Sequence, residues 1–209
     1  MSANPRLVLG SGSPRRRDLL RQLGLEFEQI ASPEEEPAPA NEAPDVYVLH
    51  SARAKARAVH RLLQRQSTPE PAIVIGADTT VCLGHRFLGK PAGAEQAAAM
   101  LQALSGRTHE VYTGIGLIAP DGRQTDDVAV TRVHMRPLSS RDIQTYVASG
   151  EPLDKAGAYG IQGLAARFIE RIEGCYYNVV GLPLARLSAL LEEAGYDFTA
   201  ADPNPSEEP

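Results

Sequence analysis

The chain has 209 residues, 43% of them hydrophobic and 22% charged, an ordinary balance for a globular protein with a sizeable core. A formal net charge of -5 argues against a nucleic-acid partner, although an anionic ligand is compatible with basic groups gathered in one cleft. Two distant cysteines without CxxC spacing, and the lack of an apolar signal or membrane-spanning run, favour a cytoplasmic protein without a disulfide framework, a zinc knuckle or a membrane partner.

The first third of the chain alternates short strands with helices. Ser13 is a good N-cap and Pro14 suits a first helical turn, so a helix is predicted directly after the opening strand. The segment Ser32–Pro44 is rich in Pro, Glu and Ala and is predicted to be a loop. The expected elements are a strand at Arg6–Gly10, a helix at Arg15–Leu23, a strand at Glu26–Ala31 and a long helix at Asp45–Gln66.

The remainder opens with the apolar run Ala72–Ala77, which is typical of a central buried strand. Later elements are expected to be a strand or hairpin arm at Val81–Leu88, a helix at Ala94–Leu104, strands at His109–Ala119 and Asp127–Met135 joined at Asp121-Gly122, a helix from the Ser139 cap to near Ser149-Gly150, a strand at Phe168–Ile172 and a helix at Pro183–Ala194. The pattern predicts a single α/β domain over residues 1–199 with a mixed sheet, and a disordered polar tail over 200–209.

The segment Ser11–Arg16 joins the first strand to the first helix. Free backbone N–H groups and the helix dipole make such a junction attractive to phosphate, and Arg15 and Arg16 add bidentate donors. A plain capped helix with solvated arginines fits equally well. A dinucleotide fingerprint is excluded, because Arg15 stands where its third glycine belongs.

The segment Gly84–Pro91 matches most of a phosphate-binding P-loop motif. The last position of that motif requires a Ser or Thr hydroxyl for magnesium and enters a helix, whereas Pro91 has no hydroxyl. We therefore reject the P-loop interpretation. Lys90 remains a candidate phosphate ligand in another geometry.

Two charged residues stand out by position. Asp78 is predicted at the exit of the Ala72–Ala77 strand, where a carboxylate can hold a divalent metal or orient water, or can simply cap a turn. Lys55 lies within the apolar face of the long helix, so it either extends to the edge or reaches an anionic ligand. Composition alone favours a solvated charge run for the glutamates Glu34–Glu36.

The segment Asp154–Gly163 is glycine-rich and shows neither helical nor strand periodicity, which suits a binding loop. The Gln162 amide could read the edge of a nucleobase through one donor and one acceptor; the alternative is a tight turn that satisfies it with backbone groups. The five histidines show no metal-ligand spacing, and the sequence contains no defensible Ser-His-Asp pattern.

Taken together, several segments closely resemble the Maf family of nucleotide pyrophosphatases. Each is weak alone, but their shared order along the chain is highly specific. The matching stretches are SGSPRR at Ser11–Arg16, SARAKA at Ser51–Ala56, GADTTV at Gly76–Val81, GKP at Gly89–Pro91, LSGRTHEVYTG at Leu104–Gly114, GEPLDKAGAYGIQG at Gly150–Gly163 and VVGLP at Val179–Pro183.

The resemblance implies an elongated mixed β-sheet flanked by helices, with two lobes and a central cleft. It implies hydrolysis of a nucleoside triphosphate between its α- and β-phosphates, with Mg²⁺ or Mn²⁺ as cofactor, and a homodimer. Asp78 would be the general base and, with Glu35, would bind the metal. Because both neighbours of Glu35 are also glutamates, Glu34 or Glu36 could take the place of Glu35. The triphosphate would be held by Ser11, Arg15, Arg16, Lys55 and Lys90.

The GIQG and SPRR forms resemble the branch acting on dTTP and UTP, and modified pyrimidine nucleotides are further candidates. In that branch Arg15, Thr79 and Gln162 would set the choice of base. Two alternatives stay open: a 7-methyl-GTP-type pyrophosphatase, and a non-catalytic nucleotide-binding regulator of septum formation.

Overall fold

The computed structural model describes residues 4–33, 42–65 and 70–199. A seven-stranded mixed sheet runs through the molecule in the order β2-β1-β3-β5-β6-β7, with β4 paired to β3 as well. The strands are β1 (Arg6–Leu9), β2 (Glu28–Gln29), β3 (Ala72–Leu83), β4 (Arg86–Leu88), β5 (Thr108–Ile118), β6 (Gln124–Met135) and β7 (Ile169–Glu173). The α-helices are α1 (Pro14–Gln22), α2 (Pro44–Gln64), α3 (Ala94–Leu104), α4 (Ser140–Ala148), α5 (Tyr176–Val180) and α6 (Leu184–Glu193).

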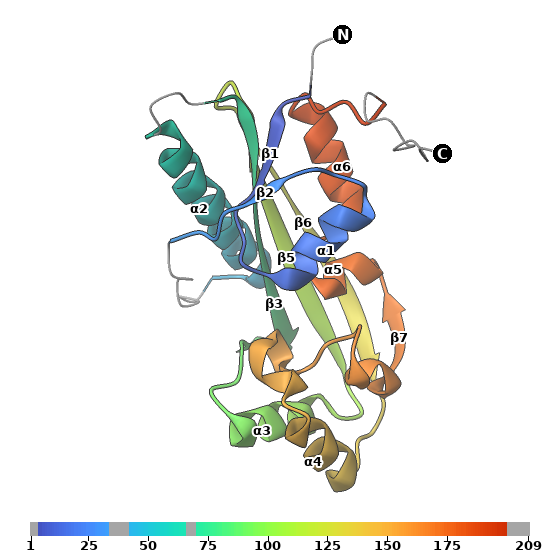
Figure 1. Ribbon diagram of the computed structural model, residues 1–209. Helices are drawn as coiled ribbons and strands as arrows, with labels where there is room; N and C mark the ends of the chain where they lie inside the picture. The colour runs from blue at the N-terminus through green and yellow to red at the C-terminus, as the bar shows by residue number, and fades with distance from the viewer. Residues whose placement is uncertain (1–3, 34–41, 66–69, 200–209) are drawn as a thin grey trace, which may run out of the picture.

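The connections explain the mixture of strand directions. Strand β1 runs parallel to β2 and β3, because α1 and then α2 carry the chain back between them. The remaining pairs are antiparallel, with tight turns at Gly84-His85 and Asp121-Gly122. Strands β3, β5 and β6 extend far beyond the short parallel part, which gives the molecule its elongated shape (Figure 1).

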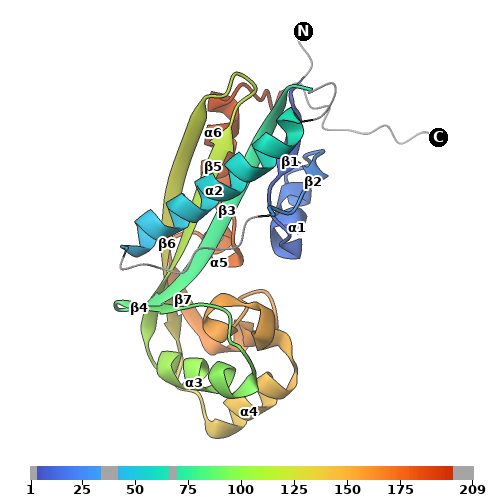
Figure 2. The same ribbon diagram turned by 90° about the vertical axis from the view of Figure 1, so that its left-hand side faces the viewer.

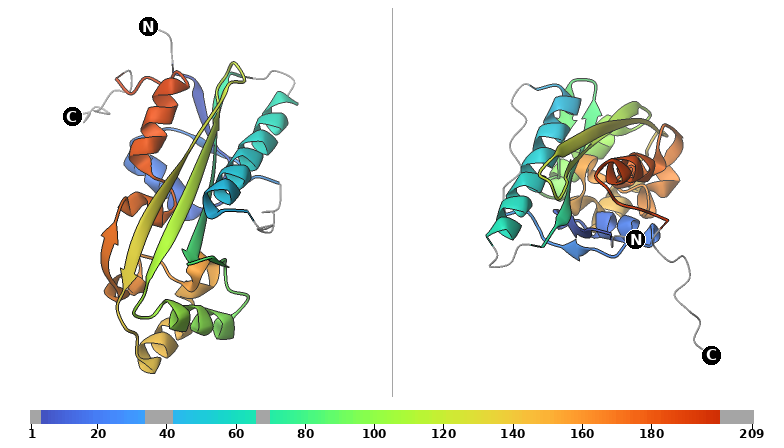
Figure 3. Two further views of the ribbon diagram at one scale, coloured as in Figure 1. Left: turned by 180° about the vertical axis from the view of Figure 1, so that it is seen from behind. Right: turned by 90° about the horizontal axis from the view of Figure 1, so that it is seen from above.

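The upper lobe in Figure 1 consists of α1, α2, α5 and α6 around β1 and the adjoining ends of the long strands. Helix α2 covers one face of the sheet and α6 the other (Figures 2 and 3). Side chains on β1 alternate accordingly: Leu7 and Leu9 pack in the cluster that includes α1 and α6, and Val8 packs in the cluster beneath α2.

The lower lobe consists of α3, α4, three short 3-10 helices and the far ends of β3, β5 and β6 (Figure 2). The 3-10 helices are η1 (Glu151–Asp154), η2 (Ala156–Ala158) and η3 (Leu164–Phe168). The lobe has its own apolar cluster, in which Leu101 and Ile143 from the helices meet Val111 and Val133 from the sheet. The expectation of an α/β fold with an elongated mixed sheet and two lobes is confirmed.

The bounds of most predicted elements agree with the structure within two or three residues. The predicted central strand, Ala72–Ala77, is too short. Strand β3 continues through Asp78 to Leu83, so Asp78 lies inside a strand, paired with Gly114, and not at a strand exit. The prediction of a strand over Glu26–Ala31 reduces to two residues, and Pro183 precedes α6 as its N-cap. The predictions for Glu34–Glu36 and for the 200–209 tail fall outside the described residues.

Two glycines allow α2 to lie directly on the sheet. A Cβ atom at Gly76 in β3 would overlap the backbone carbonyl of Ala52, and one at Gly114 in β5 would overlap that of Val48. The turn of α2 that rests on Gly76 runs from Ala52 to Ala56 and includes Lys55. This close approach therefore determines where the Lys55 side chain can reach.

Candidate active site

Two adjoining cavities lie between the upper and the lower lobe. The larger has a volume of about 420 Å³ and is bounded by the middle of β3, the Gly160–Gly163 loop and the end of α5. The smaller, of about 300 Å³, is bounded by the loop between β1 and α1. Residues from both lobes line both cavities: Ser13, Arg15, Arg16, Lys90 and Asp154.

The predicted site residues divide between these cavities by their expected roles. All five expected triphosphate ligands line the smaller cavity: Ser11, Arg15, Arg16, Lys55 and Lys90. Asp78 lines the larger cavity, together with the residues expected to choose the base, Arg15, Thr79 and Gln162. Remote segments of the chain therefore meet around two cavities that share five lining residues.

Asp78 and Lys55 form a buried ion pair where the two cavities meet. Lys55 Nζ lies 2.7 Å from Asp78 Oδ1, and the two residues are 8% and 4% exposed. The alternative that Lys55 extends to the edge of the helix is thus wrong. Within the described parts of the chain, the second oxygen of Asp78, Oδ2, accepts no hydrogen bond, which leaves it available to a ligand or to water.

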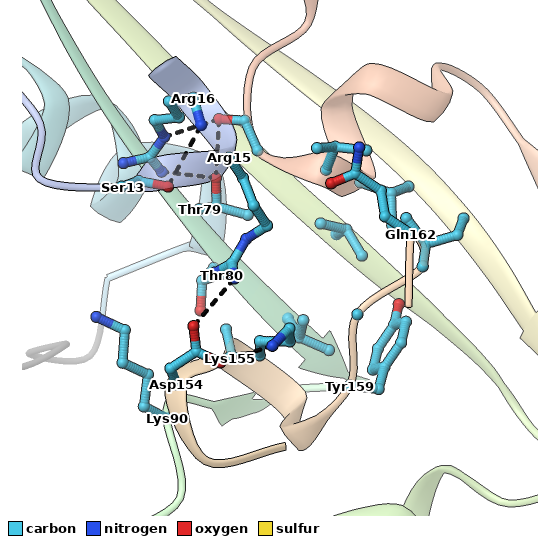
Figure 4. Close-up of a pocket in the computed structure, with 18 of the residues that line it drawn as sticks. Ser13, Arg15, Arg16, Thr79, Thr80, Lys90, Asp154, Lys155, Tyr159 and Gln162 are labelled. Atoms are coloured by element: carbon cyan, nitrogen blue, oxygen red, sulfur yellow. Dashed lines mark hydrogen bonds and ion pairs between the residues drawn. The ribbon is translucent and has the colours of Figure 1, made fainter. Parts of the chain in front are cut away.

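The Arg16 guanidinium is buried and connects three separate segments. It donates to Ser11 Oγ at 3.0 Å, to Thr79 Oγ1 at 2.9 Å and to the carbonyl of Gly181 at 2.9 Å. The alternative of a solvated arginine is wrong for Arg16. Whether Arg16 also contacts phosphate stays a prediction; its visible role is to hold the first loop, β3 and the end of α5 together (Figure 4).

The Thr79 hydroxyl continues this network into β5. Thr113 donates its proton to the carbonyl of Asn178 at 3.0 Å, so the 2.9 Å contact between Thr79 and Thr113 is donated by Thr79. Thr79 also accepts from Arg16. Because the Thr79 proton is committed to the protein, this hydroxyl can offer a nucleobase only an acceptor.

The other cations are held less tightly. Lys90 follows β4, is exposed, and has no hydrogen bond or ion pair with any residue that the structure describes. Arg15 reaches across the cleft from α1 to Asp154 in η1, with Nη1 3.1 Å from Oδ2 (Figure 4). Although burial opposes it, hydrogen bonds from Lys155 and Arg15 hold the pKa of Asp154 below its usual value.

The first loop is built as the sequence predicts. Ser13 caps α1, its Oγ accepting from the Arg16 backbone N–H at 3.4 Å, and Pro14 occupies the first turn. Ser11 Oγ accepts from the Ser13 N–H at 3.3 Å and from Arg16. The loop therefore folds around its own hydroxyls at the N-terminus of a helix, a setting that favours bound phosphate.

Gln162 lies at the larger cavity on the Gly160–Gly163 loop, and its side chain is exposed (Figure 4). Over the described ranges its amide makes no hydrogen bond, so the alternative of an amide satisfied by backbone is wrong. Val81, Val111, Val179 and Tyr159 supply apolar lining to the same cavity. A cavity with apolar walls and one free amide suits a flat heterocycle.

Sequence reasoning placed Asp154 and Lys155 in a binding loop without giving either a role, and it gave no role to Glu151. All three line the larger cavity, and Lys155 Nζ binds both Asp154 Oδ1 at 2.6 Å and the Glu151 carbonyl at 2.7 Å. For Glu151, the available signal was a charged residue three positions before that glycine-rich loop.

The described residues contain no preformed metal site, because no three or more of their His, Cys, Asp or Glu side chains are grouped so that they could hold a metal ion. The Asp78 carboxylate supplies oxygen donors at the junction of the cavities. That donor set fits a hard cation that arrives with phosphate oxygens and keeps several waters, as Mg²⁺ usually does. Glu35, the other expected ligand, lies outside the described residues.

A buried His109–Tyr159 pair supports the wall of the larger cavity. His109 is 1% exposed, and its Nε2 lies 2.7 Å from the Tyr159 hydroxyl. Its Nδ1 has no partner within the described portion of the chain. Burial, assisted by the charge of His134, lowers the pKa of His109 to about 4.

This pair predicts acid sensitivity. Between pH 6.5 and 4 the unfolded chain binds more protons at His109 than the native state, so the free energy of unfolding falls as the pH drops through that range. The loss should reach about 3 kcal/mol for this group. Urea unfolding of the wild type and of His109→Gln at several pH values would measure it. An equally steep pH dependence in the variant would refute the assignment.

The fold and the cleft indicate the class of protein. It is an α/β protein whose central cleft combines a loop at a helix N-terminus, several cations and a buried carboxylate. The chain belongs to the Maf family, because the family model for Maf-like proteins matches residues 6–194. None of the helices in the described segments has the length and apolarity that crossing a membrane requires.

Curated relatives match nearly the whole chain. It is 46% identical to the dTTP/UTP pyrophosphatase of Cupriavidus pinatubonensis over 198 residues, which cover 92% of this chain and 98% of that protein. It is 48% identical to the dTTP/UTP pyrophosphatase of Pelotomaculum thermopropionicum over 192 residues, or 91% and 97% of the two chains. Among solved structures, the Staphylococcus aureus Ham1 protein aligns with 90% of this chain and 98% of its own, at 14% identity and a TM-score of 0.48.

Proposed function

We propose that this protein is a nucleoside triphosphate pyrophosphatase that hydrolyses dTTP and UTP to the monophosphate and pyrophosphate. The observation that carries the proposal is the position of the Asp78–Lys55 pair, between a cavity lined by cations and one that holds a free amide. The names of the relatives, at 46% and 48% identity over nearly their full length, support the same substrates.

Charge favours binding of the triphosphate in the smaller cavity. A nucleoside triphosphate carries about four negative charges near neutral pH. Arg15, Lys55 and Lys90 surround this cavity, and Lys90 is free of protein partners among the described residues. Preorganised cations in a partly desolvated cleft act strongly on the charge that develops as the anhydride breaks. The net charge of -5 for the whole chain does not oppose this local arrangement.

Asp78 is proposed as the general base. Lys55 holds Oδ1, which leaves Oδ2 to accept a proton from a water molecule. The water oxygen then forms a bond to phosphorus while the bond that bridges the α- and β-phosphates breaks, and pyrophosphate leaves. A divalent cation, Mg²⁺ or Mn²⁺, would neutralise phosphate charge in this reaction; it would be held by Glu35 or a neighbouring glutamate and by Asp78 through Oδ1, so that Oδ2 stays free for the proton.

The larger cavity is proposed to receive the base. The Gln162 amide can donate to a pyrimidine carbonyl and accept from the ring N–H, and Thr79 can offer an additional acceptor. Arg15, which lines both cavities, would contact the ligand where base and phosphates meet. On the same family resemblance we expect a homodimer in the cytoplasm.

A nucleotide panel tests the proposed function. Purified protein with Mg²⁺ or Mn²⁺ should release pyrophosphate from dTTP and UTP, and chelation of the metal should stop release. Preferential hydrolysis of 7-methyl-GTP or of another purine nucleotide would overturn the substrate assignment. Tight triphosphate binding without product over hours would instead support the non-catalytic regulator.

Gln162 provides the specificity test. Gln162→Leu should lower kcat/KM for UTP by roughly tenfold or more, because two hydrogen bonds to the base are lost at about 0.5–1.5 kcal/mol each. Gln144→Leu on α4 is the matched control, since Gln144 is also exposed but lines neither cavity. Equal kinetics of the Gln162 variant and the wild type would show that Gln162 does not contact the base.

A further inference from the structure

The Gly160–Gly163 loop is fixed from below by the core of the lower lobe. Tyr146 on α4 is 1% exposed and packs edge-on against Phe168, with ring centroids 5.4 Å apart. Its hydroxyl accepts a hydrogen bond at 3.2 Å from the N–H of Gly160, the residue at the N-terminal end of the loop. The same hydroxyl donates its proton to Glu151 Oε1 at 2.9 Å.

The Glu151 carboxylate fixes the other end of the loop. Its Oε2 accepts a hydrogen bond from the Leu164 N–H at 2.9 Å, immediately after Gly163. Tyr146 and Glu151 thus form a continuous chain of hydrogen bonds between the two ends of the loop. Burial, with the hydrogen bond to Glu151, raises the pKa of Tyr146, so the phenol keeps the proton that this chain requires.

The glycines of the loop follow from this packing. A Cβ atom at Gly163 would overlap the Glu151 carboxylate, and one at Gly160 would lie 2.7 Å from Lys155 Cε. Neither glycine has a positive φ, so the space taken by these side chains, and not backbone conformation, favours glycine at both positions. The Gly163 N–H also donates to the Gly160 carbonyl at 3.1 Å, which closes the turn that presents Gln162.

We propose that Tyr146 and Glu151 are positioning residues that set base specificity by holding the Gln162 loop at the larger cavity. The inference rests on the proposed function, because it assigns Gln162 to the base. Neither residue needs to touch the reacting phosphates. Loss of the Tyr146–Glu151 chain would let Gln162 move, which should weaken recognition of the correct base while the phosphate site and Asp78 remain intact.

The test is the ratio of kcat/KM for UTP to that for GTP in Tyr146→Phe and Glu151→Ala. Each variant should reduce this ratio roughly tenfold, chiefly through KM for UTP, since a displaced Gln162 amide no longer meets the base in the correct geometry. Hydrolysis of GTP by Tyr146→Phe should change by less than about twofold, because Tyr146 lines neither cavity and the phosphate site is untouched. Glu151→Gln should recover part of the ratio, because its amide oxygen still accepts from the Leu164 N–H.

Tyr112→Phe is the matched control. The Tyr112 hydroxyl also donates to a glutamate, Glu110 Oε2 at 2.7 Å, but neither residue lines either of the two cavities of the site. The control should leave the ratio unchanged. A uniform loss of activity toward both nucleotides in Tyr146→Phe and Glu151→Ala, or an unchanged ratio, would overturn the inference and indicate support of the fold alone.

Failure of the proposed function gives a different result. The wild type would then release no pyrophosphate, and the same ratio would be read from dissociation constants for UTP and GTP with metal chelated. A preference for UTP that the two variants lose would still support the positioning role. Equal binding of UTP and GTP by the wild type would overturn it.

Discussion

Asp78→Asn should reduce the rate of pyrophosphate release from UTP by roughly 10²- to 10⁴-fold, the range that a general base contributes. The amide cannot take the proton from water, yet it fills the same space in β3 and can still contact Lys55. Nucleotide binding should persist, because the cations of the smaller cavity are unchanged. The measurements are kcat with UTP and a binding titration, with circular dichroism to verify the fold.

The ion pair complicates this variant, and two controls separate the effects. Neutralising one partner of a buried pair removes the charge attraction between the two and can cost about 3–5 kcal/mol of stability. The double variant Asp78→Asn with Lys55→Met removes both charges, so it should recover stability and remain inactive. Asp126→Asn disrupts the half-exposed pair with Arg53, 2.7 Å long and outside both cavities, and should retain activity. Near-normal turnover by folded Asp78→Asn would remove Asp78 as the base.

Gly76→Ala should be among the most damaging small substitutions in the chain. The new methyl group would overlap the Ala52 carbonyl and lie 2.7 Å from the Ala56 nitrogen, so α2 must move away from the sheet. Overpacking of this kind costs about 1–3 kcal/mol, and more where backbone opposes backbone. Because Lys55 lies in that turn of α2, its 2.7 Å contact with Asp78 should also lengthen, with loss of kcat.

The control for this substitution is Gly93→Ala. Gly93 precedes α3 in an extended conformation, and a Cβ atom there meets nothing within 4 Å. Its stability should change by no more than about 1 kcal/mol, the difference between Gly and Ala at a helix N-cap. Thermal unfolding and kcat of the two variants give the comparison. If Gly76→Ala matched Gly93→Ala in both, the close contact between α2 and β3 would be incorrect.

Local signals in the sequence predicted much of the fold, because they act over a few residues. Ser139 caps α4 with a capping box, Ser13 caps α1, and the hairpin turns at Asp121-Gly122 as its residues predict. The apolar run Ala72–Ala77 correctly indicated the central strand. Its true length could not be predicted, since Asp78, Thr79 and Thr80 are polar and yet pair with β5, with Asp78 and Thr80 buried.

The candidate site was predictable as a set of residues but not as a geometry. The Lys55–Asp78 contact joins residues 23 apart, and the Arg16–Gly181 bond joins residues 165 apart. No propensity or period encodes such pairs. The three 3-10 helices before β7 were not predicted for another reason. The helices η1, η2 and η3 are too short to produce a recognisable period, and they depend on packing against α3 and α4.

The hydrogen bonds of Arg16 have a consequence for synthesis of the protein. The first loop emerges from the ribosome long before Gly181 does. The Arg16 guanidinium, which is buried in the folded protein, therefore lacks one of its hydrogen-bond acceptors until translation is nearly complete. The cleft is therefore completed only after α5 has been synthesised, and a product truncated before α5 would keep the whole phosphate-loop sequence without a finished pocket. Such fragments should not sequester nucleotides while they await degradation.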